Sequence, residues 1–209
     1  MTYGADFGAG PGDARRGVAR PASASRRARD AALLTAGWVG VLWLLEGIDV
    51  LSGHALDTFG ITPREAGELR DVVPAAFLHF GFDHLAANSV PLLVMGFLAA
   101  LSGIRRFLAV VAVIVLVSGL GVWLTAPAHS TTAGASGVVF GLFGYLVLRG
   151  FVDRRAGDVL LGVLVGAVYG SILWGVLPTT PGVSWQGHLF GLLGGVAAAL
   201  VFRRPGRRP

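Results

Sequence analysis

The sequence predicts an all-α integral membrane protein, and three observations lead to this class. Hydrophobic residues fill 54% of the 209 positions and charged residues only 14%, whereas an ordinary soluble domain carries about 25% charged residues. Glycine is abundant at 32 residues without a collagen-like period, and glycine is more frequent in transmembrane helices than in soluble ones. The third observation is a series of long apolar stretches, from which we expect a bundle of six transmembrane helices.

Most of these apolar stretches approach the roughly 17–25 residues that a helix needs to cross a bilayer. They cover residues 31–51, 84–101, 107–126, 134–148, 159–177 and 185–202. Residues 1–30 are rich in Gly, Pro, Ser and Arg, so we expect a disordered tail. The helical domain is expected over 31–203, with a second tail over 204–209. The polar connection 52–83 is expected to hold short helices at the membrane interface.

The charges predict how the helices are oriented in the membrane. All 17 basic residues are Arg, and all except Arg64 and Arg70 fall in the termini or loops on one side of a six-helix topology. Because cytoplasmic loops carry an excess of basic residues, we expect both termini in the cytoplasm and the long loop outside. The net charge of +5 could suggest a nucleic-acid partner, but the apolar composition argues against one. The expected surroundings are the lipid bilayer of a bacterial cell membrane.

Chemically active side chains lie near the outer ends of three predicted helices. They are His79, His84 and Asn88 near the second helix, Ser136 in the fourth and His188 in the sixth. Polar groups inside a membrane span are costly, which makes each a candidate functional residue. About 20 Å of helix separates Ser136 from Arg149, and about 22 Å separates His188 from Arg203. We therefore expect the Ser136 hydroxyl and the His188 imidazole at one depth.

Taken singly, these residues have simpler interpretations, which stay open at this point. Ser136 lies among glycines, so it can be interpreted as a small residue that lets two helices pack closely. His84 and Asn88, at positions i and i+4 of one helix face, suit helix capping or a hydrogen bond between helices. His188 alone, at the start of a helix, can be interpreted as a residue at the membrane–water interface.

Together, a hydroxyl and an imidazole at one depth predict nucleophilic catalysis. A neutral imidazole can remove the proton of a serine that attacks a carbonyl and return it to the leaving amine. The fourth and sixth apolar stretches contain no acid, so we expect a Ser136 and His188 dyad rather than a triad. Phe140, one turn after the serine, is expected to hold the ring. Supporting residues are the flanking Gly134 and Gly137, which leave room for a substrate backbone, and the expected oxyanion donors: the Ser136 N–H, Asn88 and His84.

Three motifs in this order resemble the rhomboid family of intramembrane serine proteases. They are H-x4-H-x3-N from His79 to Asn88, GASG around Ser136, and GHLFGLLGG from Gly187 to Gly195. The resemblance implies a six-helix bundle with Ser136 as nucleophile, His188 as base, and Asn88 and His84 at the oxyanion. It also implies that His79 supports the entrance of the second helix. Gly191 and Gly195 would let the sixth helix pack against the fourth.

The resemblance also implies the partners of the protein. Its substrates would be other membrane proteins, cut in or near their transmembrane segments, at an active site that opens to the extracytoplasmic side. No cofactor and no metal are expected. The sequence departs from the family pattern at Phe140, where many relatives have Tyr, and it lacks a clear Trp-Arg pair in the first loop. Glu46 and Asp49 in the first helix have no assigned role; one guess pairs Glu46 with Arg64.

The sequence disfavours three other functions relative to proteolysis. A catalytically inactive relative that binds transmembrane helices is disfavoured by the presence of both Ser136 and His188. A small transporter is disfavoured because the polar groups gather near one face and not at the midplane. A metal site built from His79, His84 and His188 lacks an HExxH motif or a carboxylate partner. The absence of Cys removes disulfides, thiolate metal sites and cysteine nucleophiles.

Overall fold

The computed structural model describes Met1 and residues 23–204, and within this part it is helical with no strand. The α-helices are α1 (Ala24–Leu51), α2 (Phe82–Ala100), α3 (Ile104–Thr125), α4 (Ser136–Asp153), α5 (Ala156–Tyr169) and α6 (Trp185–Val201). The 3₁₀ helices are η1 (Ala55–Phe59), η2 (Ala66–Val72), η3 (Pro74–Phe77) and η4 (Gly170–Val176). The expected all-α fold of six main helices is confirmed, and the expected short helices of the long connection are η1, η2 and η3.

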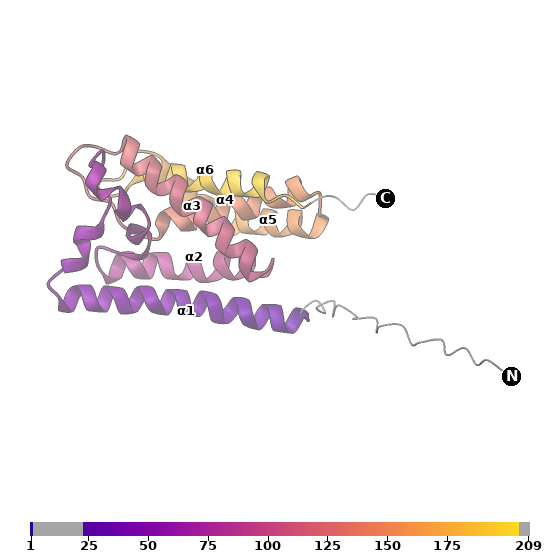
Figure 1. Ribbon diagram of the computed structural model, residues 1–209. Coiled ribbons are helices and arrows are strands. Elements are labelled where there is room, and N and C mark those ends of the chain that lie inside the picture. The colour runs from indigo at the N-terminus through magenta and orange to yellow at the C-terminus, as the bar shows by residue number, and fades with distance from the viewer. Residues whose placement is uncertain (2–22, 205–209) are drawn as a thin grey trace.

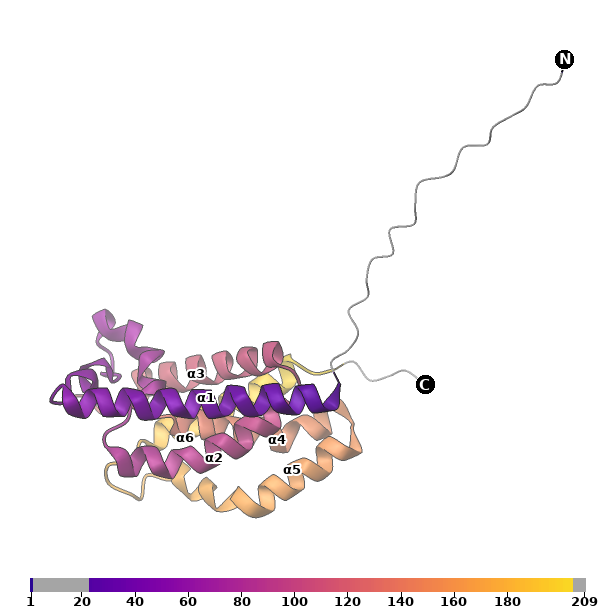
Figure 2. The ribbon, with the colours of Figure 1, turned by 90° about the horizontal axis from the view of Figure 1, so that it is seen from below.

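The helices form one bundle in which α4 is the central element. Figures 1 and 2 show α1 and α3 along the outside, α5 on another side, and α4 among the other helices. Of the 18 residues of α4, 72% are buried inside the protein. Of an 18-residue stretch of α5 and η4, only 11% are buried. Residues at the start of α4 are therefore surrounded by protein, whereas α5 presents most of its apolar surface outward.

The helix lengths fit a membrane protein. Five elements are long and apolar enough to cross a bilayer: α1, α2, α3, α4, and α5 continued by η4. The sixth, α6, is also apolar but has 17 residues, which is about 25 Å of helix and at the short end of the spanning range. The orientation of the termini relative to the membrane remains a prediction.

Glycines bring the backbones of α4 and α6 together. A side chain at Gly191 would overlap the carbonyl of Gly137, and one at Gly195 would overlap the carbonyl of Gly141. Such close approach needs residues without a Cβ, as in other small-residue helix contacts in membranes. The start of α4 and the start of α6 are thereby held against each other.

The long connection is fixed to the segment that leads into α4. Ile61 and Thr132 exchange two backbone hydrogen bonds, of 2.8 Å and 3.1 Å. The N–H of Gly134 donates to the carbonyl of Ala75 at 2.8 Å. The side chain of Arg64 donates to the carbonyls of α3's last turn, including Ala126 at 2.9 Å. Arg64 therefore does not pair with Glu46, and that guess was wrong.

Two expected boundaries were also wrong. Helix α1 begins at Ala24 instead of residue 31, because Ser23 caps it by accepting the N–H of Arg26. The rest of the expected N-terminal tail, residues 2–22, and residues 205–209 lie outside the described part. Helix α4 continues to Asp153 instead of ending at 148, because its last turn is held by ion pairs.

These ion pairs tie the ends of several helices together, opposite the Ser136 end of the bundle. Arg149 lies 3.1 Å from Asp158 of α5 and also donates to Ser102. Arg106 of α3 lies 3.7 Å from Asp153. Asp153 also accepts the backbone N–H of Arg204, at 2.7 Å, just after α6. Buried carboxylates thus find cationic or N–H partners where the helices end.

Candidate functional site

Ser136 is the first residue of α4, at the end of a turn that requires a glycine. Gly134 has φ of +140°, a region that residues with a side chain rarely adopt. A Cβ at Gly134 would lie 2.8 Å from Cε1 of His84 and 3.7 Å from the Ser136 hydroxyl. The His84 ring therefore approaches the backbone of this turn, beside the Ser136 hydroxyl, more closely than a residue with a Cβ would allow.

His188 lies in the first turn of α6, and two contacts orient its ring. The Nδ1 atom is 2.8 Å from the carbonyl oxygen of Gly175 in η4. A carbonyl only accepts, so Nδ1 carries the proton and donates it, which leaves Nε2 unprotonated in the neutral ring. Phe140 of α4 stacks on the imidazole, with centroids 4.1 Å apart and planes 7° apart.

Gly175 is a contact within the candidate site that sequence reasoning missed. Its carbonyl is the partner that fixes the His188 tautomer, and a Cβ at Gly175 would lie 3.0 Å from Nδ1 and 2.8 Å from the Phe140 ring. Every residue has a backbone carbonyl, so the residue types do not show which carbonyl accepts this hydrogen bond. The only hint in the sequence is a glycine in the last part of the fifth apolar stretch.

His79 contacts the turn before the serine. Its Nε2 accepts the backbone N–H of Ala135 at 3.2 Å, and its ring lies edge-on to His84 with centroids 5.1 Å apart. Burial, with a smaller effect from His84, lowers the pKa of His79 from 6.5 to about 4. A neutral ring is the form that can accept a hydrogen bond, so the pKa agrees with the contact.

Asn88 lies on the same face of α2 as His84, one turn further on. One N–H of its amide donates to the His84 carbonyl at 3.0 Å. An amide has two N–H donors, so one is left for another acceptor. Asn88 is buried and His84 is half-buried.

A cavity of about 920 Å³ joins these elements. The sequence-predicted residues that line it are Ser136, His188, His84, Asn88 and Phe140. Its remaining walls come largely from residues 126–133 before α4 and from residues 178–186, which lead into the first turn of α6. The structure thus brings five predicted residues to one cavity, with His79 behind the turn, and Gly134 and Gly137 beside the serine. Gly191 and Gly195 lie in the α4–α6 contact.

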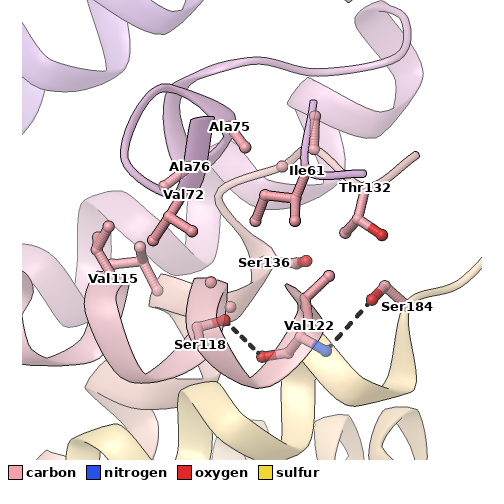
Figure 3. A pocket seen from close by; sticks show the side chains of 16 residues that line it. Ile61, Val72, Ala75, Ala76, Val115, Ser118, Val122, Thr132, Ser136 and Ser184 are labelled. Atoms are coloured by element: carbon pink, nitrogen blue, oxygen red, sulfur yellow. Dashed lines mark hydrogen bonds between the residues drawn. The ribbon is translucent and has the colours of Figure 1, made fainter. Parts of the chain in front are cut away.

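A second, smaller cavity of about 30 Å³ also borders Ser136. Figure 3 shows Ser136 between Ile61 and Val72 of the long connection, Ser118 of α3 and Ser184 before α6. The Ser118 hydroxyl donates to the carbonyl of Gly187 at 2.9 Å. The Ser184 hydroxyl accepts the backbone N–H of Gly187 at 3.2 Å. This volume is enough for a water molecule, since one water needs about 10–15 Å³ by this measure.

The fold and composition define the class: a helical integral membrane protein with several apolar spans. The model of the Rhomboid domain matches residues 66–205. The chain is 42% identical over 179 residues to "Uncharacterized protein Rv1337" of Mycobacterium tuberculosis (strain H37Rv), covering 82% of this chain and 75% of that protein. It is 31% identical over 157 residues to "Putative rhomboid protease YdcA" of Bacillus subtilis (strain 168), covering 74% and 73%. The chain belongs to the rhomboid family.

Proposed function

We propose that this protein is an intramembrane serine endopeptidase that uses Ser136 and His188 as a catalytic dyad. The observation that carries the proposal is the hydrogen bond from His188 Nδ1 to the Gly175 carbonyl. It leaves Nε2 unprotonated, on a ring that lines the same cavity as the Ser136 hydroxyl. An unprotonated Nε2 is what a general base for serine requires.

The chemistry follows from these two groups. The Ser136 oxygen attacks the scissile carbonyl while Nε2 of His188 takes its proton. The imidazolium then gives that proton to the leaving amine as the peptide C–N bond breaks, which leaves an ester on Ser136. A water molecule, deprotonated by the same nitrogen, hydrolyses the ester and restores the hydroxyl. The smaller cavity beside Ser136 is large enough to keep such a water close.

The negative oxygen that develops during attack needs donors already in place. The backbone N–H of Ser136 is one, because the first N–H groups of a helix have no partner within it. The second N–H of the Asn88 amide and the ring of His84 are the side-chain donors that face the same cavity. Removing one donor from such a set costs about 10²–10³ in kcat in a well-studied serine protease.

The substrates that fit this site are transmembrane segments of other proteins. A helix hides its carbonyls in hydrogen bonds, so the substrate must unwind before Ser136 can reach one. The segments 126–133 and 178–186 line the cavity and offer backbone groups to an extended chain. The distribution of Arg favours a site that opens to the extracytoplasmic side of a bacterial cell membrane, with both termini in the cytoplasm.

A fluorophosphonate probe tests the dyad without knowledge of the substrate. We expect wild-type protein in detergent to become labelled on Ser136, and His188→Ala to lose the labelling. The matched control is His129→Asn, which removes an exposed imidazole outside the cavity and should label normally. Equal labelling of wild type and His188→Ala would contradict a dyad and favour an inactive relative that binds transmembrane helices.

A further inference from the structure

A cluster of acidic and imidazole groups lies at the end of α1, in residues that the proposed proteolysis does not use. Asp49 is in the last turn of α1, His54 follows it in a turn, and Asp57 is in η1. Nδ1 of His54 lies 2.8 Å from an oxygen of Asp49 and 3.8 Å from an oxygen of Asp57. One ligand atom from each residue lies within 4.8 Å of the others.

The local backbone is bent so that these three groups meet. Gly53 and His54 both have left-handed conformations, with φ of +68° and +65°, which folds the chain back over the end of α1. The second oxygen of Asp49 accepts the N–H of Leu56 at 2.7 Å, and its carbonyl accepts the N–H of His54 at 2.8 Å. Contacts of this kind orient a ligand carboxylate from behind.

A third carboxylate makes this more than an exposed acidic patch. Glu46 lies one turn before Asp49 on the same face of α1 and is only 2% exposed. Neither of its oxygens has a hydrogen-bond partner, and one oxygen of Asp57 is also buried without one. The groups that act on the Glu46 carboxyl are the Gly81 backbone and the charges of Asp49, Asp57 and His54.

A buried carboxylate without a partner is costly, and beside two others it is costlier still. Arg64, the cation that the sequence suggested as a partner of Glu46, donates instead to carbonyls at the end of α3. Among the residues the structure describes, His54 is the only group acting on Glu46 that can carry a positive charge. The arrangement therefore lacks positive charge at its centre.

We propose that Asp49, His54 and Asp57, with Glu46 behind them, form a binding site for a divalent transition-metal ion of the zinc type. Imidazole and carboxylate ligands suit zinc, at about 2.0–2.2 Å from the ion. Tetrahedral geometry at that distance separates ligand atoms by about 3.4 Å, and the observed separations of 2.8 Å and 3.8 Å lie on either side. An ion there would join the end of α1 to the long connection.

Direct titration of tag-free, EDTA-treated full-length protein in detergent tests the site, with ZnCl₂ as the probe in a calorimeter. The hydrogen bond to Asp49 raises the pKa of His54, so titration at about pH 8 favours the unprotonated ring that a metal needs. We expect one zinc ion per chain and a higher unfolding temperature with zinc than with EDTA. CaCl₂ and MgCl₂ should produce neither effect.

Variants decide where the zinc binds. Asp57→Asn and His54→Asn should each weaken zinc binding by at least about tenfold; Asn at 54 tolerates the left-handed backbone. His84→Ala, which removes an imidazole from the large cavity, and Asp83→Asn, an exposed acid at the start of α2, should bind zinc as wild type does. Unchanged binding in both Asp57→Asn and His54→Asn, no zinc binding at all, or binding of calcium instead would each overturn the proposal. His54 and Asp57 lie after the end of α1, and neither side chain is buried in the bundle.

Discussion

The imidazole of His188 lies parallel to the ring of Phe140, with centroids 4.1 Å apart and planes 7° apart. Phe140 is one turn after Ser136 on α4, so the stacked ring is held over the turn that begins with the serine. Together with the Gly175 carbonyl at Nδ1, this stacking orients His188 without a hydrogen bond to an acid in the part of the chain that the structure describes. A third group that orients the base is the general requirement of such a catalyst.

Removing the stacked ring should slow catalysis more than it harms the fold. Stacked aromatic pairs contribute about 0.5–1.5 kcal/mol, so Phe140→Leu should lower kcat about 2- to 12-fold. The matched control is Phe143→Leu, which removes a similar ring from the buried core of the same helix away from His188. Unfolding temperatures and kcat for both variants separate the effects. A larger loss of kcat in Phe143→Leu would contradict the role given to Phe140.

A methyl group at Gly134 should fill the space between His84 and the serine. Gly134→Ala places a Cβ 2.8 Å from the His84 ring at a φ of +140°, so the turn must shift to relieve the contact. Displacement of a catalytic group by about 1 Å can cost about 100-fold in rate, and we expect at least that loss. Gly166→Ala on α5, where a Cβ meets nothing within 4 Å, should keep full activity. A fully active Gly134→Ala variant would show that the close approach of the His84 ring to Gly134 is not needed.

The contact between α4 and α6 predicts an effect on stability. Gly191→Ala would overlap the Gly137 backbone, and overpacking of this kind costs about 1–3 kcal/mol. We expect a lower free energy of unfolding in a detergent and SDS titration. Gly40→Ala on α1, which meets nothing within 4 Å, should be neutral or stabilising, since Ala favours helix by about 1 kcal/mol over Gly. The account of this contact fails if both variants unfold alike.

The pKa of His79 predicts how stability depends on pH. Its pKa is about 4 in the folded protein and 6.5 ordinarily, so the unfolded chain binds this proton between those values while the folded protein does not. The contribution of His79 to the free energy of unfolding is therefore fully present above pH 6.5 and is lost as the pH drops toward 4. His79→Gln still offers an acceptor to the Ala135 N–H but does not titrate, so its unfolding temperature should fall less on acidification.

The exposed His129 supplies the control for that experiment. His129→Asn removes an imidazole outside the site and should keep the wild-type dependence of unfolding temperature on pH. If His79→Gln loses stability on acidification as steeply as wild type, His79 is not the group responsible.

The sequence predicts the helices well because lipid-facing spans must be apolar over a fixed length. It misplaced the start of α1 because that helix has 28 residues, about 42 Å, and so extends well past the roughly 30 Å apolar core. The extra turns carry Arg26, Arg27 and Arg29, which read as a polar tail. It ended α4 too early for a similar reason, because Arg149 and Asp153 are charged yet buried by their partners.

The candidate site was predictable in its side chains and not in its backbone. Ser136, His188, His84 and Asn88 stand out as polar residues in apolar helices. The carbonyl of Gly175 and the pairing of Ile61 with Thr132 are main-chain contacts, which residue types do not specify. The Asp49, His54 and Asp57 cluster depends on two consecutive left-handed residues, Gly53 and His54, so its residues look unrelated until the turn is seen.

Cleavage of single-span membrane proteins tests the central claim most directly. A panel of such proteins in liposomes is incubated with wild type and with Ser136→Ala, and cut sites are mapped by mass spectrometry. Wild type is predicted to cut at least one panel member in or beside its transmembrane segment, and Ser136→Ala to cut none. Equal cleavage by Ser136→Ala would contradict the account.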